Sequence, residues 1–353
     1  MVPERPAGIR DGPPRGRGRR TRGPASPGAG ESGCRRGAGR FADAVRALIV
    51  TNMYPSRARP WLGSFVADQV AALRRTGEAE VEVFAFDPGG ARAYARAARS
   101  LRAHAGSRTY DIVHAHYGLS AWPALAARAR RRVVTLHGTD LAHPRARPLT
   151  LAALGTCDLV AAVSRRLAET IPAWMGRDRV AILPCGVDLG RFAPIDRRRA
   201  RELLGLPPDG PYLLFPSDPA RSEKRHDRAL AVAGDVPLLT LRGADRRSVP
   251  LLVNAANAVL VCSEREGFGL AVLEALACNV PVLATPVGIH PEALAGIEGT
   301  LCAPFSQSRW RAALEPHLAL ADPRVAGRSR AERWSSDAMA QLVLKAWREL
   351  LGR

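Results

Sequence analysis

Short apolar segments alternate with helical segments along most of the chain, and this alternation is what most constrains its fold. The segment 64–77 illustrates the helical part, since Phe65, Val66 and Val70 recur at helical spacing and Gly77 follows as a C-cap. The candidate strands of the first half are 47–53, 80–86, 110–116, 132–138, 158–164 and 179–185. Strands that alternate with helices predict a parallel, doubly wound α/β sheet.

The alternation breaks at 186–196 and then begins a second time. Gly186, Gly190 and Pro194 interrupt any periodicity there, and a helix is expected after Asp196. The candidate strands of the second half are 211–217, 236–242, 258–264 and 280–286. Two such halves predict two Rossmann-like domains facing each other across a cleft, with ligands bound at the carboxyl ends of the strands.

Residues 1–42 differ from the rest in composition. The first 40 residues contain ten Gly, six Pro and ten Arg, and almost no large apolar side chain. Such a segment cannot bury enough surface to fold, so we expect a disordered basic tail. It is either a tail that touches nucleic acid or anionic lipid, or the product of a wrongly assigned translation start. The second interpretation, or no function, is favoured because the first credible strand begins near Arg46.

The remaining composition is that of a globular protein. Apolar residues make up 46% of the chain, yet no uncharged apolar run approaches the roughly 18 residues that span a bilayer. The N-terminus lacks the apolar core of a secretory signal. The six cysteines form no C-x-x-C pair and no zinc-like cluster. These features predict a cytoplasmic protein with reduced thiols and no bound metal.

The charge of the chain is strongly positive, at +19, and comes almost wholly from arginine. An arginine-rich nucleic-acid-binding protein is therefore one alternative, but the basic residues are dispersed and few aromatic side chains accompany them. Basic clusters at 91–102 and 126–132 suit contact with an anionic membrane better. Lys224 and Lys345 are the two lysines, and this rarity draws attention to Lys224.

Common cofactor signatures are missing from the sequence. The loop after the first strand, YPSRARPWLGSF, has a single glycine and so lacks the G-x-G-x-x-G of a dinucleotide site. No P-loop motif and no D-x-D pair occurs either. We therefore expect no cofactor and no metal.

A glycine-containing loop stands before the helix of the segment SEREGFGLAVLEALA, residues 263–277. Gly267 and Gly269 allow close backbone approach, and free N–H groups at the helix start can hold a diphosphate. The alternative is a capping box made by Ser263 and Glu266. That alternative would place both glycines in the first helical turn, at about 1 kcal/mol each relative to Ala, so the ligand loop is favoured.

Glu274 in the same segment lacks a partner on its own helix. Its neighbours three and four positions away are Leu270, Ala271, Ala277 and Cys278. An unpaired carboxylate beside an apolar stripe is unfavourable, so a group outside the helix is expected to meet it.

Five motifs together resemble one enzyme family. Residues 266–274, EGFGLAVLE, resemble the E-x7-E motif of retaining glycosyltransferases with the GT-B fold, especially family 4. The segments DIVHAHYG, VTLHGTD, PCGVDLGRF and ALACNVPVLATPVG are similar to further segments of that family. The stretch 51–70 resembles a bacterial subgroup with teichuronic-acid-type transferases. The resemblance extends from about Ala47 to Ala321.

The resemblance implies roles for the residues of the second half. Glu274 would accept the ribose hydroxyls of a nucleotide sugar, and Glu266 would meet hydroxyls of the donor sugar beside Phe268 and Gly269. The amides of Leu270 and Ala271 would meet the phosphate. Lys224 matches the family's diphosphate-binding lysine, whereas the family's arginine is replaced by Pro219, and Arg221 is the candidate substitute.

The resemblance also implies roles in the first half. His137 would approach the donor sugar near the reacting carbon, and together with Lys224 and Glu266 it forms the candidate catalytic set. Gly63, His116 and Asp140 are candidates on the acceptor side. His114 and His116 share one face of a strand, but no third metal ligand is apparent, so acceptor contact or packing is expected.

The expected protein is therefore a retaining glycosyltransferase that moves a sugar from a nucleoside-diphosphate sugar to a glycan or lipid-linked acceptor in cell-surface polysaccharide synthesis. Its expected parts are an acceptor domain at 43–190, a nucleotide-sugar domain at 191–334 and a final helix at 335–353, whose return to the first domain stays open. Fixed positive groups would replace a metal at the leaving phosphate. A GT-B-fold sugar-nucleotide epimerase is the alternative. The expected location is the cytoplasm, with peripheral contact at the inner face of the membrane left open.

Overall fold

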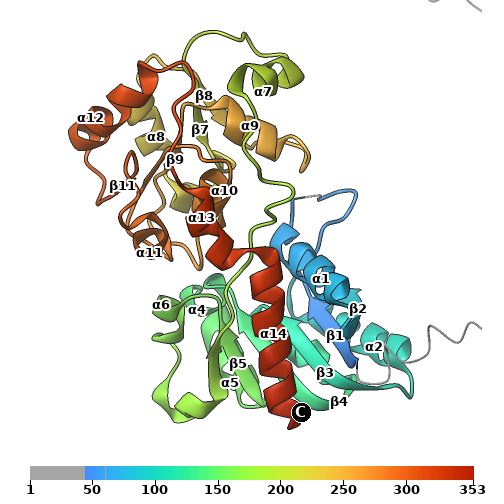
Figure 1. Ribbon diagram of the computed structural model, residues 1–353. Coiled ribbons are helices and arrows are strands. Elements are labelled where there is room, and N and C mark those ends of the chain that lie inside the picture. The colour runs from blue at the N-terminus through green and yellow to red at the C-terminus, as the bar shows by residue number, and fades with distance from the viewer. Residues whose placement is uncertain (1–43, 60) are drawn as a thin grey trace, which may run out of the picture. The chain divides into compact units, whose positions relative to one another are not determined.

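A computed structural model of the protein describes residues 44–59 and 61–353 (Figure 1). The predicted basic tail at 1–42 lies outside these residues. Between them, the described residues form two parallel sheets with helices on their faces, which confirms the doubly wound α/β prediction.

The first sheet has six parallel strands in the order β2-β1-β3-β4-β5-β6. Its strands are β1 (Val45–Thr51), β2 (Ala79–Ala85), β3 (Thr109–His116), β4 (Arg128–Leu136), β5 (Leu159–Ala162) and β6 (Val180–Ile182). Its helices are α1 (Ser64–Thr76), α2 (Ala91–Ala105), α3 (Ala121–Ala124), α4 (Thr139–Ala142), α5 (Ala146–Leu154) and α6 (Arg165–Ala168). The chain order reverses between β1 and β3, which is where ligands bind to such sheets.

The second sheet has five parallel strands in the order β11-β10-β9-β7-β8. Its strands are β7 (Leu213–Phe215), β8 (Leu238–Thr240), β9 (Ala258–Val261), β10 (Val282–Ala284) and β11 (Leu301–Cys302). The helices of this half are α7 (Arg197–Leu204), α8 (His226–Ala233), α9 (Val249–Ala255), α10 (Leu270–Ala277), α11 (His290–Leu294), α12 (Gln307–Leu318) and α13 (Arg328–Ala331). Here the order reverses between β7 and β9, so the loops after these two strands share the ligand-binding edge.

Helix α14 (Ser336–Leu351) ends the chain and packs on the first sheet. Its apolar side chains Val343, Leu344 and Trp347 are fully buried in one cluster with Val66 and Val70 of α1. Figure 1 shows this helix in red beside the blue α1. The chain thus crosses from the first sheet to the second after β6 and returns to the first sheet before α14. The two crossing segments meet where Val187 pairs with Ser335.

Several predicted boundaries differ from the observed ones. The strand predicted at 132–138 begins four residues earlier, because the arginine-rich segment 128–131 pairs with β3. Helix α8 begins at His226, because Arg225 before it adopts a left-handed conformation with φ 57° and separates the helix from a short 3-10 turn, η4 (Ser222–Lys224). Helix α1 has its predicted C-cap, Gly77, and α7 begins directly after Asp196 as predicted, with the Asp196 side chain accepting a hydrogen bond from the amide of Arg199.

Candidate functional site

The loop between β9 and α10 carries Glu266, whose carboxylate has two partners. Lys224 of η4 donates to its Oε1 at 2.6 Å, and Ser263 donates to the same oxygen at 2.7 Å. Both Lys224 and Glu266 are largely buried, with 15% and 12% of their side chains exposed. The loops after β7 and β9 therefore bring together the two candidate residues that sequence analysis could link only by resemblance.

The two glycines of this loop are required by its surroundings. A Cβ at Gly267 would lie 1.9 Å from the carbonyl oxygen of His137, and a Cβ at Gly269 would lie 2.4 Å from Nε2 of His290. Gly269 also has a φ of 109°, which side-chain-bearing residues rarely adopt. Glycine at 267 thus allows the loop to meet the end of β4 backbone to backbone.

Helix α10 begins at Leu270, after both glycines, and its N-cap Gly269 contributes no side-chain cap. The capping-box alternative is therefore wrong: Ser263 bonds to Glu266, but neither caps the helix. The first amides of any α-helix lack intrahelical acceptors, so those of Leu270 and Ala271 are available to an anion. The Phe268 side chain is buried, and its carbonyl accepts a hydrogen bond from Ile289 N at 2.8 Å.

Glu274, one turn further along α10, has charged neighbours from outside the helix. Burial raises its pKa to about 7, Arg191 and Arg246 oppose this rise, and the Asp68 carboxylate adds to it. Within 44–59 and 61–353, no hydrogen bond to its carboxylate is present. The expectation that Glu274 meets groups outside its helix is thus met by two arginines, while its ribose contact stays a prediction.

Asp68 of α1 joins these arginines. It accepts hydrogen bonds from Arg191 at 2.9 and 2.7 Å and a further one from Arg246. Its side chain is only 6% exposed. No local sequence pattern connects these three residues, because Asp68 lies 123 and 178 positions from the two arginines along the chain.

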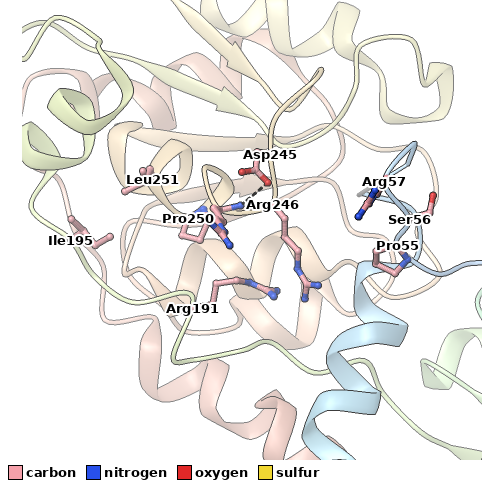
Figure 2. Close-up of a pocket in the computed structure, with 10 residues that line it drawn as sticks. Pro55, Ser56, Arg57, Arg191, Ile195, Asp245, Arg246, Pro250 and Leu251 are labelled. Atoms are coloured by element: carbon pink, nitrogen blue, oxygen red, sulfur yellow. Dashed lines mark hydrogen bonds between the residues drawn. The ribbon is translucent and has the colours of Figure 1, made fainter. Parts of the chain in front are cut away.

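A cavity of about 820 Å³ adjoins this cluster. Figure 2 shows Arg191 and Arg246 side by side in it, with Arg57 on the loop after β1. Its lining residues are Pro55, Ser56, Arg57, Arg191, Ile195, Asp245, Arg246, Arg247, Pro250 and Leu251. The cavity is thus formed by the loop after β1, the 183–196 connection, the segment before α9 and the first turn of α9, and it is rich in arginine.

Arg221, the candidate substitute for the family's arginine, is occupied elsewhere. Its guanidinium donates twice to Glu223, at 2.9 and 2.6 Å, and its side chain is 54% exposed. The structure does not bring it to Glu266, so its contact with a diphosphate stays a prediction.

The end of β4 supplies the candidate residues of the first half. His137 follows the strand, and the fully buried Asp140 accepts hydrogen bonds from the amides of His137 at 2.9 Å, Gly138 at 2.8 Å and Gly118 at 3.3 Å. Asp140 therefore holds the loop before it in place. Its acceptor contact stays a prediction.

The other acceptor-side candidates are His116 and Gly63. His116, at the end of β3, bonds to His137 at 3.1 Å. Gly63 caps α1 with a φ of 65°, and a Cβ there would lie 2.2 Å from the carbonyl oxygen of Met53. The ring of Phe65, on the first turn of the same helix, lies 4.8 Å from the ring of His137.

Direct contacts join the two halves of the site. Ser164, which caps α6, donates to the carbonyl of Gly267 at 2.8 Å, and Arg166 donates to the carbonyl of Pro286 at 2.7 Å. His137, Glu266 and Lys224 thus lie on loops that meet, where the carboxyl ends of the two sheets face each other. This is the geometry of a two-domain α/β enzyme with its site between the sheets.

Comparison with known proteins agrees with this geometry. The family model of Glycosyltransferase Family 4 matches residues 36–191, and that of Glycosyl transferases group 1 matches residues 218–335. A D-inositol 3-phosphate glycosyltransferase of Actinosynnema mirum is 32% identical over 310 residues, covering 67% of this chain and 72% of the relative. The protein of the same name from Mycobacterium avium is 32% identical over 292 residues, covering 67% and 68%.

Solved structures show the same fold. Sucrose-phosphate synthase from Thermosynechococcus elongatus aligns with a TM-score of 0.68 and 20% identity over 88% of this chain and 99% of its own. HepE from Anabaena in complex with UDP and glucose aligns with a TM-score of 0.62 and 16% identity over 86% of this chain and 99% of its own.

The chain is therefore a GT-B-fold enzyme that transfers sugar from a nucleotide sugar. It belongs to the glycosyltransferases of family 4. The relatives named above are D-inositol 3-phosphate glycosyltransferases, so the resemblance to teichuronic-acid-type transferases is not supported at that finer level. These matches do not favour the epimerase or nucleic-acid-binding alternatives.

Proposed function

We propose that the enzyme transfers a sugar with retention of configuration from a nucleoside-diphosphate sugar to an acceptor that carries a phosphate. The observation that carries the donor part is the buried pair of Lys224 and Glu266 beside the uncapped start of α10. Lys224 and the amides of Leu270 and Ala271 would stabilise the negative charge that grows on the leaving phosphate. Glu266 would hold a hydroxyl of the donor sugar, and Glu274 the ribose.

Same-face attack assisted by the leaving phosphate is the proposed route to retention. Glu266 is held by Lys224 and Ser263, which suits a group that orients a hydroxyl better than a free nucleophile. His137, at the end of β4, would approach the transferred sugar. The loops of the two halves are in contact through Ser164 and Gly267, and this contact would exclude water from the reacting carbon and so limit hydrolysis of the donor.

Metal independence is part of the proposal. The sequence has no D-x-D pair, and the described part of the chain has no group of three His, Cys, Asp or Glu side chains placed to hold an ion. The fixed positive groups at the start of α10 can take over the role of a metal at the leaving phosphate.

The acceptor is inferred from charge and from the relatives. Their printed names include an inositol phosphate, and Arg57 lies on the loop after β1 beside the site. The second candidate acceptor is a lipid-linked phosphate in a cell-surface glycan pathway, which would present the same phosphate group to the arginines. It is favoured by the exposed arginines of α2, Arg92, Arg96, Arg99 and Arg102, which suit peripheral contact with an anionic membrane. No helix within the described residues is long and apolar enough to cross a membrane.

A donor and acceptor panel tests the proposal. UDP-, GDP- and ADP-sugars are incubated with the enzyme without an acceptor, or with an inositol phosphate, a lipid-linked phosphate in anionic vesicles or a neutral sugar as acceptor. Release of nucleoside diphosphate is measured with and without EDTA. Acceptor-dependent release that EDTA leaves intact supports the proposal, and the productive acceptor separates the two sources. Release with neutral sugar acceptors alone, or its loss in EDTA, would contradict the acceptor class or the metal independence. No release with any donor would overturn the assignment of the site.

A further inference from the structure

Three histidines form a stack beneath the candidate site. His114 and His116 come from β3, and His137 follows β4. The ring centroids of His114 and His116 lie 4.7 Å apart and those of His116 and His137 lie 5.3 Å apart, with the rings within 23° of parallel. His114 and His116 are fully buried, whereas His137 is partly exposed.

All three rings are neutral at physiological pH. Burial lowers the pKa of His116 to about 3, and burial and the neighbouring histidines lower the pKa of His114 and His137 well below the usual value. A neutral imidazole carries one ring hydrogen, on either Nδ1 or Nε2, and its other nitrogen can only accept. The hydrogen-bond partners then decide which nitrogen carries the hydrogen.

The buried Gln69 of α1 fixes this choice for His116. Its side-chain Nε2 donates to Nε2 of His116 at 3.3 Å, so His116 carries its hydrogen on Nδ1. Nδ1 of His116 therefore donates to Nε2 of His137 at 3.1 Å. His137 in turn accepts at Nε2 and carries its hydrogen on Nδ1.

His114 belongs to a separate chain of hydrogen bonds. The indole Nε1 of Trp347, which can only donate, bonds to Nδ1 of His114 at 3.3 Å. His114 therefore donates from Nε2 to Oγ1 of Thr135 at 2.7 Å. This second chain does not reach the ring nitrogens of His137.

We propose that Gln69 and His116 are positioning residues that hold His137 as the Nδ1–H tautomer, so that it donates a hydrogen bond to an oxygen of the reacting sugars. This role rests on the proposed function in placing His137 at the transferred sugar. Among the described residues, Nδ1 of His137 has no partner, so the hydrogen is available to a substrate. The N–H of a neutral imidazole can bind such an oxygen without placing a positive charge beside an oxocarbenium-like carbon.

The tautomer can be read directly by nitrogen NMR of the enzyme labelled at histidine. We expect His137 to be protonated at Nδ1 and unprotonated at Nε2. Gln69→Leu removes the side-chain amide that donates a hydrogen bond to His116. In this variant the second tautomer of His137, with its hydrogen on Nε2, should appear. Its kcat should fall about tenfold, the effect of one hydrogen bond lost in the transition state, while the donor Kd stays unchanged.

Thr135→Val is the matched control, because it breaks the chain of His114 and leaves that of His137 intact. It should preserve both the His137 tautomer and the kcat. Protonation of His137 at Nε2 in the wild-type enzyme would overturn the proposal, as would an unchanged tautomer in Gln69→Leu. If the tautomer is as stated but no donor and acceptor pair reacts, the proposed function fails while the positioning of His137 stands.

Discussion

Asp68 on α1 is bound by both terminal nitrogens of Arg191, which lies on the connection between the two sheets. Arg246, before α9, bonds to the same carboxylate. The buried Asp68 carboxylate of the first half therefore binds two arginines, one from the connection between the sheets and one from the second half. Burial has the largest effect on the pKa of Glu274, and the two arginines and Asp68 of this cluster adjust it further, so the cluster influences the charge at the proposed ribose contact.

Replacing Asp68 should lower the pKa of Glu274. Asp68→Asn removes an anion that raises this pKa and leaves the two arginines that lower it. The midpoint of the pH dependence of donor binding should then move below 7, as measured by calorimetry over a pH series. Asp209→Asn, at an exposed ion pair with Arg198, is the control and should leave the midpoint in place. A midpoint that stays or rises in Asp68→Asn contradicts the coupling.

Donor binding itself should depend on the protonation of Glu274. With a pKa of about 7, the carboxyl is mostly protonated below pH 7 and ionised above it. An ionised carboxylate accepts hydrogen bonds from both ribose hydroxyls, so the donor Kd should rise as the pH falls from 8 to 6. Folding raises this pKa from 4.5 to about 7, so the folded state holds the proton more tightly than the unfolded state. The free energy of unfolding should therefore fall as the pH rises towards 7 and through it. In Glu274→Gln both dependences should flatten; a Kd that still rises on acidification would assign the titration to another group.

The two lysines offer a matched test of the diphosphate contact. Lys224→Ala should lower kcat by about 10²- to 10³-fold, the usual effect of removing one group that stabilises transition-state charge. Lys345→Ala removes an exposed lysine on α14 and should leave kcat unchanged. Steady-state kinetics with the productive donor measures both variants. Equal kcat values for Lys224→Ala and Lys345→Ala would remove Lys224 from the site.

A methyl group at Gly267 should separate the two halves of the site. Its Cβ would meet the carbonyl oxygen of His137, which is backbone and cannot rotate away. A misplacement near 1 Å can cost about 10²-fold in rate, so the kcat of Gly267→Ala should fall by that order. Gly90→Ala, where a Cβ meets nothing within 4 Å, is the control. Full activity in Gly267→Ala would show that the close approach is not needed for turnover.

The fold was predictable from local patterns to a large extent. Apolar segments and helical spacing were sufficient for the strands of the first sheet, for β7, β8, β9 and β10 of the second, and for helices such as α1 and α7. They did not predict β11, which has only two residues and joins the sheet by pairing with β10. The start of β4 was not predictable either, because an arginine-rich segment becomes a strand only through pairing with β3 and through ion pairs such as that of Arg130 with Asp111. Tertiary pairing there overrides local propensity.

The site was predictable only where residues are close in the sequence. The E-x7-E motif indicated Glu266 and Glu274, and the rarity of lysine drew attention to Lys224. The bonds of Asp68 to Arg191 and Arg246 span 123 and 178 positions, so spacing could not reveal them. The need for Gly267 likewise follows from the position of His137 in space.

Trp347 should contribute strongly to the stability of the first half, although it lies near the end of the chain. It is fully buried against α1 and the first sheet, and Trp→Ala at such sites costs about 3–5 kcal/mol. Denaturant unfolding of Trp347→Ala should show a loss of this order. Leu342→Ala, on the exposed side of the same helix, should change the free energy of unfolding little. Comparable losses in the two variants would mean that α14 is not held by its buried face.

The packing of α14 has a consequence for the order of folding during synthesis. The core around β1 and α1 includes Val343, Leu344 and Trp347, which follow the whole second sheet in the sequence. Domains usually fold as they emerge, N-terminal first. Here β1 and α1 are made before the second half of the chain, so part of their apolar surface stays uncovered until α14 has been synthesised.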